Sequence, residues 1–188
     1  MNHYKLPMLS ITALFFIAQI LLILGLAEKG HIDYVQSVLV TTGFWAIYLY
    51  LEARYKLNMS NYVRIIMLLA LVSDGFFGNY VNFYATSTVF DKIQHVFGTY
   101  AFSLFAYTLV AGLLKSPVQR SVTFILIISL GVSIGAFYEI LEFFTDSMSH
   151  PVPPSQPSLL DTNLDLISDV IGALLAAIHV TYRKGKKM

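Results

Sequence analysis

The chain has 188 residues, of which 56% are hydrophobic and only 12% are charged, and its mean hydropathy is +0.67. This composition is too apolar for a soluble domain of this length and indicates an integral membrane protein. The chain has no cysteine, which excludes disulfides and thiolate metal sites. Its net charge of +1, without a basic stripe, gives no reason to expect a nucleic-acid partner.

Apolar runs predict six membrane-spanning helices, since one span needs about 20 mostly apolar residues. In chain order the expected spans are residues 7–27, 34–53, 62–82, 92–114, 120–144 and 160–181. They leave too little chain for a soluble domain, so we expect residues 1–188 to form a single six-helix transmembrane domain of the all-α class. The run at 7–27 is longer than a signal-peptide core, although Gly25-Leu26-Ala27 loosely resembles a cleavage site, so its processing stays open.

The basic residues predict the orientation, because cytoplasmic loops carry an excess of Lys and Arg. If both termini are cytoplasmic, only Lys29 and Lys92 of the twelve basic residues lie on the outer side. The other ten then lie on the cytoplasmic side: Lys5, Arg54, Lys56, Arg64, Lys115, Arg120, Arg183, Lys184, Lys186 and Lys187. We therefore expect a multi-pass protein of a bacterial cytoplasmic membrane with both termini inside.

Acidic residues gather in the outer half of the helices in this topology. Eight of the eleven lie there: Asp74, Asp91, Glu139, Glu142, Asp146, Asp161, Asp165 and Asp169. Residues three or four apart share one side of a helix, so Asp91 is on the side of His95, and Glu139 is on the side of Glu142. Small residues, which let helices approach closely, share these sides: Gly131, Gly135 and Gly172. We therefore expect the acidic sides to face one another and not lipid.

The last expected span is the most informative, because Asp161, Asp165 and Asp169 recur in it every four residues. An aspartate at the centre of a span costs about 2.5–3.5 kcal/mol to insert. Asp169 and Asp74, the deepest, therefore give the strongest reason to expect a functional site. Simpler interpretations stay open: Asp161 follows Ser158 and could cap the helix, Asp165 could interact with the helix dipole, and Asp74 could hydrogen-bond within the helix packing.

Carboxylates with one imidazole predict a site for a divalent metal ion, namely Mg²⁺, Mn²⁺, Fe²⁺ or Zn²⁺. The expected ligands are Asp91, His95, Glu139, Asp165 and Asp169, with Asp74 and Asp161 as possible additional ligands and Glu142 as the catalytic base. A metal there would polarise a phosphoryl or ester oxygen or activate water. We expect hydrolysis or transfer on a lipid-linked substrate from the outer leaflet. Alternatively, His95 could merely donate to Asp91, and Glu142 could reach water.

Three motifs carry a resemblance to a known family: Asp91-x3-His95, Tyr138-Glu139-x2-Glu142 and Asp161-Thr-Asn-x-Asp165-x3-Asp169. Their order resembles the YjdF-like family of uncharacterised bacterial inner-membrane proteins, over about residues 60–180. Val96 and Phe143 stand where that family often has Phe and Trp. The segment "DKIQHVFGTY" alone has a weaker resemblance to VanZ-like membrane proteins. The resemblance implies a site at these residues and no particular reaction.

Two other functions fit the same residues. A cation- or proton-coupled transporter would use the carboxylates and His95 to bind and release ions. Alternatively, a structural membrane protein would use them as a hydrogen-bonded acidic network. The Pro- and Ser-rich loop at 145–158 could act as a lid over the cluster. Membrane lipids are the expected surroundings, and the sequence leaves the oligomeric state, the metal and the substrate open.

Overall fold

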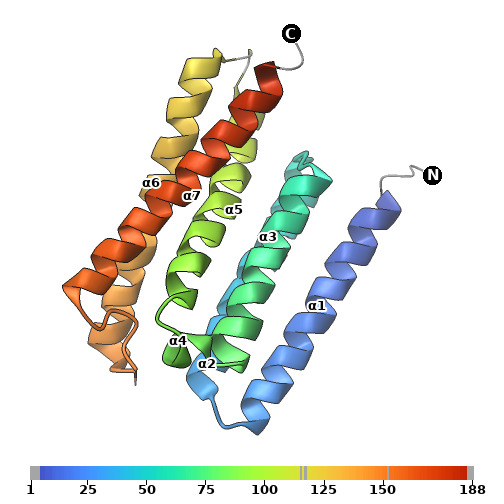
Figure 1. The fold of residues 1–188 in the computed structure, drawn as a ribbon. Helices are drawn as coiled ribbons and strands as arrows, with labels where there is room; N and C mark the ends of the chain where they lie inside the picture. The colour runs from blue at the N-terminus through green and yellow to red at the C-terminus, as the bar shows by residue number, and fades with distance from the viewer. Residues whose placement is uncertain (1–4, 115, 117, 152, 186–188) are drawn as a thin grey trace. The chain divides into compact units, whose positions relative to one another are not determined.

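The structure, a computed structural model, describes residues 5–114, 116, 118–151 and 153–185, and all of the regular secondary structure in these residues is helical. Figure 1 shows the elements, which are α1 (Lys5–Glu28), α2 (Ile32–Tyr55), α3 (Asn61–Ser73), the π-helix η1 (Asp74–Tyr80), α4 (Phe83–Thr86), α5 (Phe90–Leu113), α6 (Arg120–Ser149) and α7 (Leu159–Gly185). Six segments are long and apolar enough to cross a membrane: Met8–Glu28, Ile32–Tyr55, Asn61–Tyr80, Phe90–Leu113, Arg120–Ser149 and Leu159–Tyr182. The predicted all-α, six-span, multi-pass membrane protein is confirmed.

Two spans differ in detail from the expected ones. The third, expected at 62–82, changes from α-helix to π-helix at Asp74. The fifth, expected to end at 144, continues to Ser149, and the Thr145 hydroxyl donates to the Leu141 carbonyl (2.9 Å) in this added turn. His150 then ends the helix with a left-handed backbone (φ 48°). The added turn matters because the connection to α7 begins at His150.

The contacts within the chain divide it into two compact units, Met1–Thr86 and Ser87–Met188. In the first unit, α1 and α2 share an apolar core in which Leu22, Leu26 and Val38 are buried. The η1 segment packs against the same core at Gly75, where a Cβ would lie 3.2 Å from Leu22 Cδ1 and 3.4 Å from Val38 Cγ2. A Cβ at this position would therefore require the Leu22 side chain to shift by a few tenths of an ångström.

The first unit also contains a buried ion pair between α2 and α3. Arg64 is 1% exposed, and its Nη2 donates to Glu52 Oε1 and Oε2 at 2.6 and 2.8 Å. The guanidinium also lies over the rings of Trp45 and Tyr48. Arg64, one of the ten basic residues predicted on the cytoplasmic side, thus lies inside the protein in the first turn of α3. The predicted orientation of the termini stays a prediction.

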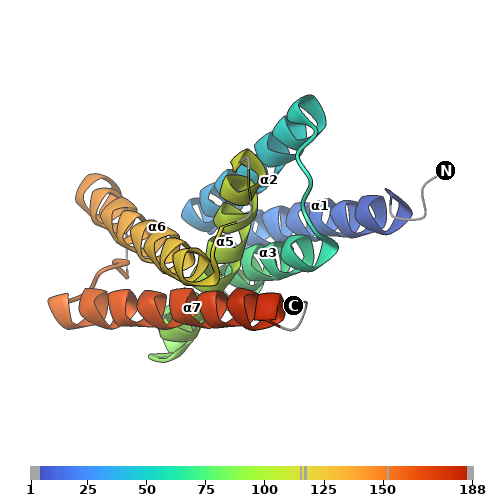
Figure 2. The same cartoon turned by 90° about the horizontal axis from the view of Figure 1, so that it is seen from above.

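The second unit consists of α5, α6 and α7, which pack pairwise against one another. Because α6 runs opposite to α5 and α7, the start of α5, the end of α6 and the start of α7 lie at one end of the unit (Figure 1). Figure 2 shows that α6 and α7 diverge toward this end, where the segment that connects them lies. Seven of the eight predicted site residues are on these three helices; Asp74 is the exception.

Candidate metal centre

Glycines bring the helices of the second unit close together behind the acidic residues. A Cβ on Gly135 of α6 would lie 2.6 Å from Asp169 Cβ of α7 and would also overlap the carboxyl group of Asp169. A Cβ on Gly131 would lie 2.5 Å from Ala173 Cβ. At Gly172 of α7, an added Cβ would lie 3.0 Å from the backbone nitrogen of Tyr100 in α5. Such close approach fits the predicted role of the small residues and directs the carboxylates into the space between the helices.

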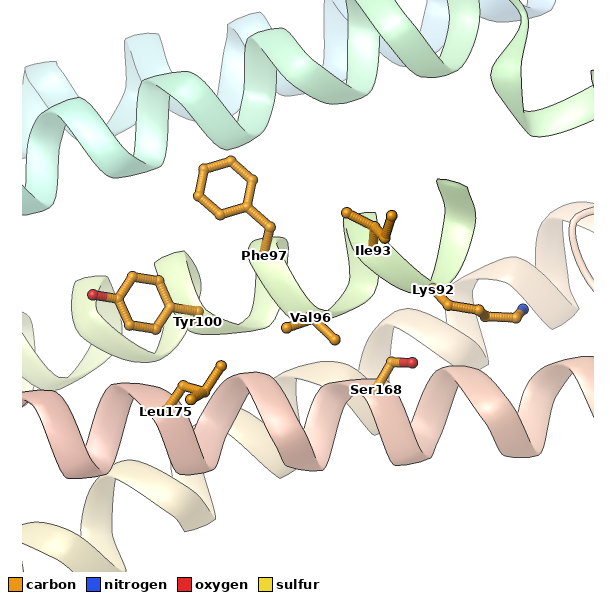
Figure 3. A pocket seen from close by; sticks show the side chains of 7 residues that line it. All are labelled: Lys92, Ile93, Val96, Phe97, Tyr100, Ser168 and Leu175. Atoms are coloured by element: carbon orange, nitrogen blue, oxygen red, sulfur yellow. The ribbon is translucent and has the colours of Figure 1, made fainter. Parts of the chain in front are cut away.

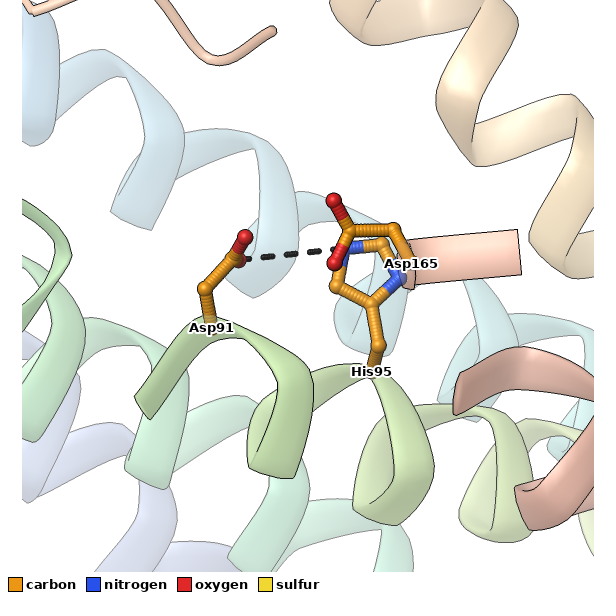
Figure 4. Close-up of side chains that lie close together, drawn as sticks. All are labelled: Asp91, His95 and Asp165. Atoms are coloured by element: carbon orange, nitrogen blue, oxygen red, sulfur yellow. Dashed lines mark ion pairs between the residues drawn. The ribbon is translucent and has the colours of Figure 1, made fainter. Parts of the chain in front are cut away.

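His95 occupies the centre of these carboxylates. Its Nδ1 lies 3.2 Å from Asp169 Oδ1, which also accepts a hydrogen bond from the Thr99 hydroxyl. Its Nε2 lies 3.8 Å from Asp91 Oδ1, 3.7 Å from Glu139 Oε1 and 3.7 Å from Asp165 Oδ1. Figure 4 shows Asp91, His95 and Asp165 converging from α5 and α7. One imidazole nitrogen is therefore held by Asp169, and the other faces three carboxylate oxygens from three helices.

The second oxygen of each of these three carboxylates accepts a hydrogen bond from another side chain. The Lys92 ammonium donates to Asp91 Oδ2 at 3.0 Å and to Asp165 Oδ2 at 2.7 Å. Gln156 Nε2 donates to Glu139 Oε2 and to the Glu139 carbonyl, both at 2.8 Å. Each carboxylate is thus fixed by one oxygen and presents the other to His95 Nε2.

Two of the presented oxygens are buried without a hydrogen-bond partner among the described residues. They are Glu139 Oε1 and Asp165 Oδ1, on side chains that are 6% and 1% exposed. A third such oxygen is Asp169 Oδ2, which lies next to Gly135. Buried polar atoms in folded proteins nearly always have a partner. Atoms of the first unit, such as Gln19 Oε1 and Asn79 Nδ2, also lack one within the described part of the chain, so the distinguishing feature here is that Glu139 Oε1 and Asp165 Oδ1 both face His95 Nε2.

The connection between α6 and α7 contacts the cluster. Asp146 accepts hydrogen bonds from the backbone N–H groups of Ser155 and Gln156 at 2.9 and 2.7 Å, which fixes Gln156 beside Glu139. The Ser158 hydroxyl then accepts from the N–H of Asp161 (3.1 Å) in the first turn of α7. Ser158 therefore caps this helix, and Asp161 instead binds Lys92 at 2.5 Å. The lid role of residues 145–158 stays a prediction.

The structure gathers Asp91, His95, Glu139, Glu142, Asp161, Asp165 and Asp169 at one end of the second unit. The remaining candidate, Asp74, lies in η1 of the first unit, where the Tyr84 hydroxyl donates to its Oδ1 at 2.5 Å. The sequence placed Lys92 on the outer side near the acidic residues but indicated no role for it in the site, although it stands beside Asp91 in the first turn of α5. No pattern marked Gln156 in the connecting loop.

A separate cavity of about 480 Å³ lies between α5 and α7 (Figure 3). Most of its lining is apolar, and the lining residues are Lys92, Ile93, Val96, Phe97, Tyr100, Ser168 and Leu175. Figure 3 shows Lys92 at one end of the cavity, with its ammonium directed away from Tyr100 and Leu175. None of the predicted metal ligands lines this cavity, but Lys92, which pairs with three aspartates of the cluster, does.

Two overlapping sets of residues have the geometry to hold an ion. The first is Asp91, His95 and Asp165, and the second is His95, Glu139 and Glu142; within each set the donor atoms lie within 4.8 Å of one another. Oxygen-rich sets with an imidazole suit divalent cations such as Mn²⁺, Fe²⁺ and Zn²⁺. A buried acidic and histidine group that could hold a metal is therefore present in this membrane protein.

Comparison with known proteins places the chain in a family. It belongs to the family described as "Predicted membrane protein (DUF2238)", whose sequence model matches residues 9–186. A relative from Thermotoga maritima, described as an "Uncharacterized protein", is 34% identical over 107 residues, which cover 57% of this chain and 55% of the relative. The match thus spans little more than half of that protein. No solved structure matches. The predicted likeness to YjdF-like and VanZ-like proteins stays a prediction.

Proposed function

We propose that this membrane protein binds one divalent metal ion at His95 Nε2, with Asp91 and Asp165 from one donor set and Glu139 from the other as further ligands. The observation that carries the proposal is the pair of unpartnered, buried oxygens on Glu139 and Asp165, which both lie 3.7 Å from the same nitrogen. With metal–ligand distances of about 2.1 Å, two donors 3.7 Å apart subtend an angle of about 125° at the ion. One ion thus fits between His95 Nε2 and either oxygen, and the two oxygens, which belong to different donor sets, must approach each other to bind the same ion.

The partner of the other imidazole nitrogen supports the same assignment. A metal-binding histidine commonly donates its second ring N–H to a carboxylate, which fixes the tautomer and the ring orientation. Asp169, 3.2 Å from Nδ1, occupies this place, and Thr99 holds the accepting oxygen. In this proposal Asp169, which the sequence predicted as a ligand, acts through His95. Nδ1 carries the proton, and Nε2 presents its lone pair to the metal.

Charge balance also favours a bound cation. The cluster contains six carboxylates, on Asp91, Glu139, Glu142, Asp161, Asp165 and Asp169. Lys92 is the one lysine or arginine that pairs with any of them among the described residues. A divalent ion would offset much of the remaining repulsion, which is strong because buried charges are poorly screened. The set of donors fits Mn²⁺, Fe²⁺ or Zn²⁺ and, with water completing its shell, Mg²⁺.

The reaction that we propose is metal-dependent hydrolysis or transfer on a lipid-linked substrate. The site lies on membrane-spanning helices, so a substrate that approaches from the bilayer carries a hydrocarbon part. Partly buried Glu142 lies beside His95 and Glu139 and belongs to one of the two ligand sets only. It is therefore the carboxylate best placed to act as a general base on water next to the metal.

The first experiment measures metal binding by the full chain, purified in detergent and stripped with a chelator. Titration with Mn²⁺ and Zn²⁺, with metal analysis after dialysis, should give close to one equivalent. His95→Ala and Glu139→Gln should weaken binding at least 100-fold. Asp33→Asn, which removes an exposed carboxylate of the first unit, should leave binding unchanged. A folded wild-type protein that takes up neither ion contradicts the proposal.

A second experiment separates metal binding from chemistry. Glu142→Gln should bind Mn²⁺ within a few-fold of the wild type but lose about 10²–10⁴-fold of any Mn²⁺-dependent turnover of phospholipids or prenyl phosphates, the usual range for a general base. Equal loss of binding and turnover would make Glu142 a ligand. Unchanged turnover would exclude Glu142 as the base.

Cation or proton transport is the second candidate, and one further pair of residues favours it. The Tyr100 hydroxyl and His179 Nδ1 are 2.5 Å apart, between α5 and α7. His179 is ten residues beyond Asp169, or about 15 Å along the helix. This pair extends the polar groups of α7 away from the cluster. Vesicles that contain the protein should then show proton or cation flux that depends on both Asp169 and His179, and vesicles without flux speak against this candidate.

A further inference from the structure

Asp91 and Asp165 each present their two carboxylate oxygens to two different neighbours. In each carboxylate, Oδ2 accepts from the Lys92 ammonium, while Oδ1 faces His95 Nε2. Two carboxylates that bridge two neighbouring positions in this way are the arrangement of a dinuclear metal centre, in which the ions lie about 3.5–4 Å apart. One of the two positions here holds an ammonium group.

The Lys92 position has a complete shell of its own. In addition to the two bridging carboxylates, Asp161 Oδ1 accepts from Lys92 Nζ at 2.5 Å. An ammonium group has three donors, and these three aspartates use all of them. In the described part of the chain Asp161 forms an ion pair with Lys92 and none with His95, so it belongs to the Lys92 position alone, as a terminal ligand belongs to one ion of a pair.

We propose that Lys92 is a built-in second cation: its ammonium occupies the second position of a carboxylate-bridged pair and keeps a second metal ion out. The identity of the first position rests on the proposed function. The covalently attached charge cannot leave, so the protein takes up one divalent ion at any metal concentration. The centre then contains one divalent ion and one fixed ammonium charge. Together they face the substrate group that the two ions of a dinuclear centre would bind.

A simpler interpretation treats Lys92 as an ordinary ion-pair partner that stabilises the start of α5. Its side chain is 18% exposed, and its ammonium pairs with Asp91, Asp161 and Asp165. That interpretation predicts lower stability without Lys92 and no change in the number of metal ions. The built-in cation predicts that removal of the ammonium opens a site for one more ion, formed by Asp91, Asp161 and Asp165.

The experiment counts Mn²⁺ ions bound by full-length Lys92→Met and by the wild type, and records the electron paramagnetic resonance spectrum of each. Lys92→Met keeps most of the side-chain volume and loses the charge. It should bind one more Mn²⁺ than the wild type, and the bridged pair should give an exchange-coupled spectrum. Lys92→Met with Asp161→Asn should lose the extra ion, because Asp161 serves that position alone. Lys29→Met, which removes a lysine that binds the Tyr80 carbonyl, is the matched control and should gain no ion.

The test of this inference is the difference in the number of bound Mn²⁺ ions between Lys92→Met and the wild type, whatever number the wild type binds. A wild type without metal contradicts the proposed function, yet a Lys92→Met protein that gains one ion still supports the built-in cation. A folded Lys92→Met protein with no additional Mn²⁺ overturns it. If the variant folds only when Mn²⁺ is present, the ion has replaced the ammonium and the inference is supported. If it fails to fold with and without Mn²⁺, the ion cannot take that place and the inference is wrong.

Discussion

Gly135→Ala tests whether Asp169 controls the metal site through His95, because it changes no charge and no ligand. The added Cβ would lie 2.6 Å from Asp169 Cβ and would overlap the carboxyl group. Carbon atoms in contact are normally about 3.5–4.0 Å apart, so Asp169 or α6 must move by about 1 Å. Since Asp169 Oδ1 is 3.2 Å from His95 Nδ1, a shift of this size breaks the contact that orients the ring.

The structure sets the expected size of two effects. Overpacking at a tight helix contact costs about 1–3 kcal/mol of the free energy of unfolding. Loss of the carboxylate behind a metal-binding histidine usually lowers metal affinity about 10–100-fold, which is about 1.4–2.7 kcal/mol. We expect both effects in Gly135→Ala, with metal affinity falling by at least tenfold.

The assay combines Mn²⁺ titration with unfolding in increasing sodium dodecyl sulfate, for the wild type and two alanine variants. Gly98→Ala is the matched control, because it lies in α5 of the same unit and an added Cβ there meets nothing within 4 Å. It should bind Mn²⁺ as the wild type does and be at least as stable, since alanine favours a helix over glycine by up to about 1 kcal/mol. If Gly135→Ala loses stability but keeps its full affinity for Mn²⁺, the Asp169–His95 contact does not control the site.

Four further outcomes follow from the same geometry. Asp169→Asn should lower Mn²⁺ affinity about 10–100-fold while keeping the stoichiometry, measured by titration; loss of the ion altogether would make Asp169 a ligand. Gln156→Ala should lower Mn²⁺ affinity by up to about tenfold, because Glu139 loses the donor that fixes it, and should speed hydrogen exchange at the backbone N–H groups of residues 155, 156 and 158; unchanged exchange would separate this loop from the site. Glu52→Gln should cost about 3–5 kcal/mol of unfolding free energy, since it leaves Arg64 buried without its carboxylate, with no change in metal stoichiometry. Mn²⁺ at 100 times its dissociation constant should stabilise the wild type by about 2.7 kcal/mol and should not stabilise His95→Ala.

The sequence was sufficient for the membrane class and the six spans, because hydrophobic runs of this length are typical of membrane-spanning helices. It was also sufficient to predict that the acidic helix sides face one another, since spacings of three and four residues place Asp165 and Asp169 on one side of α7. The glycines supported that prediction, and the structure confirms their close contacts. What these patterns could not give was the division of roles among the carboxylates.

Those roles depend on which carboxylate oxygen each neighbouring donor binds, and this is set by side-chain geometry between helices. Lys92 and Asp165 are 73 residues apart, and no periodicity relates them. Gln156 lies in a loop whose path is set by the backbone hydrogen bonds that Asp146 accepts, in a segment where the sequence shows only turn-forming residues. The burial of Arg64 could not be predicted either, because it depends on the ion pair with Glu52 and on the rings of Trp45 and Tyr48.

The arrangement of oxygens, more than the number of acids, distinguishes a metal site from a structural network. In a network, each buried carboxylate oxygen would pair with a donor, because an unpaired one costs about 1–3 kcal/mol or more. Here the donors Lys92 and Gln156 take one oxygen from each of Asp91, Asp165 and Glu139, and the remaining oxygens face one imidazole nitrogen at 3.7–3.8 Å. That spacing is too long for hydrogen bonds and suits two ligands of a common ion. A purely structural cluster would have no reason to leave these oxygens converging without a donor, so the convergence itself argues for a cation between them.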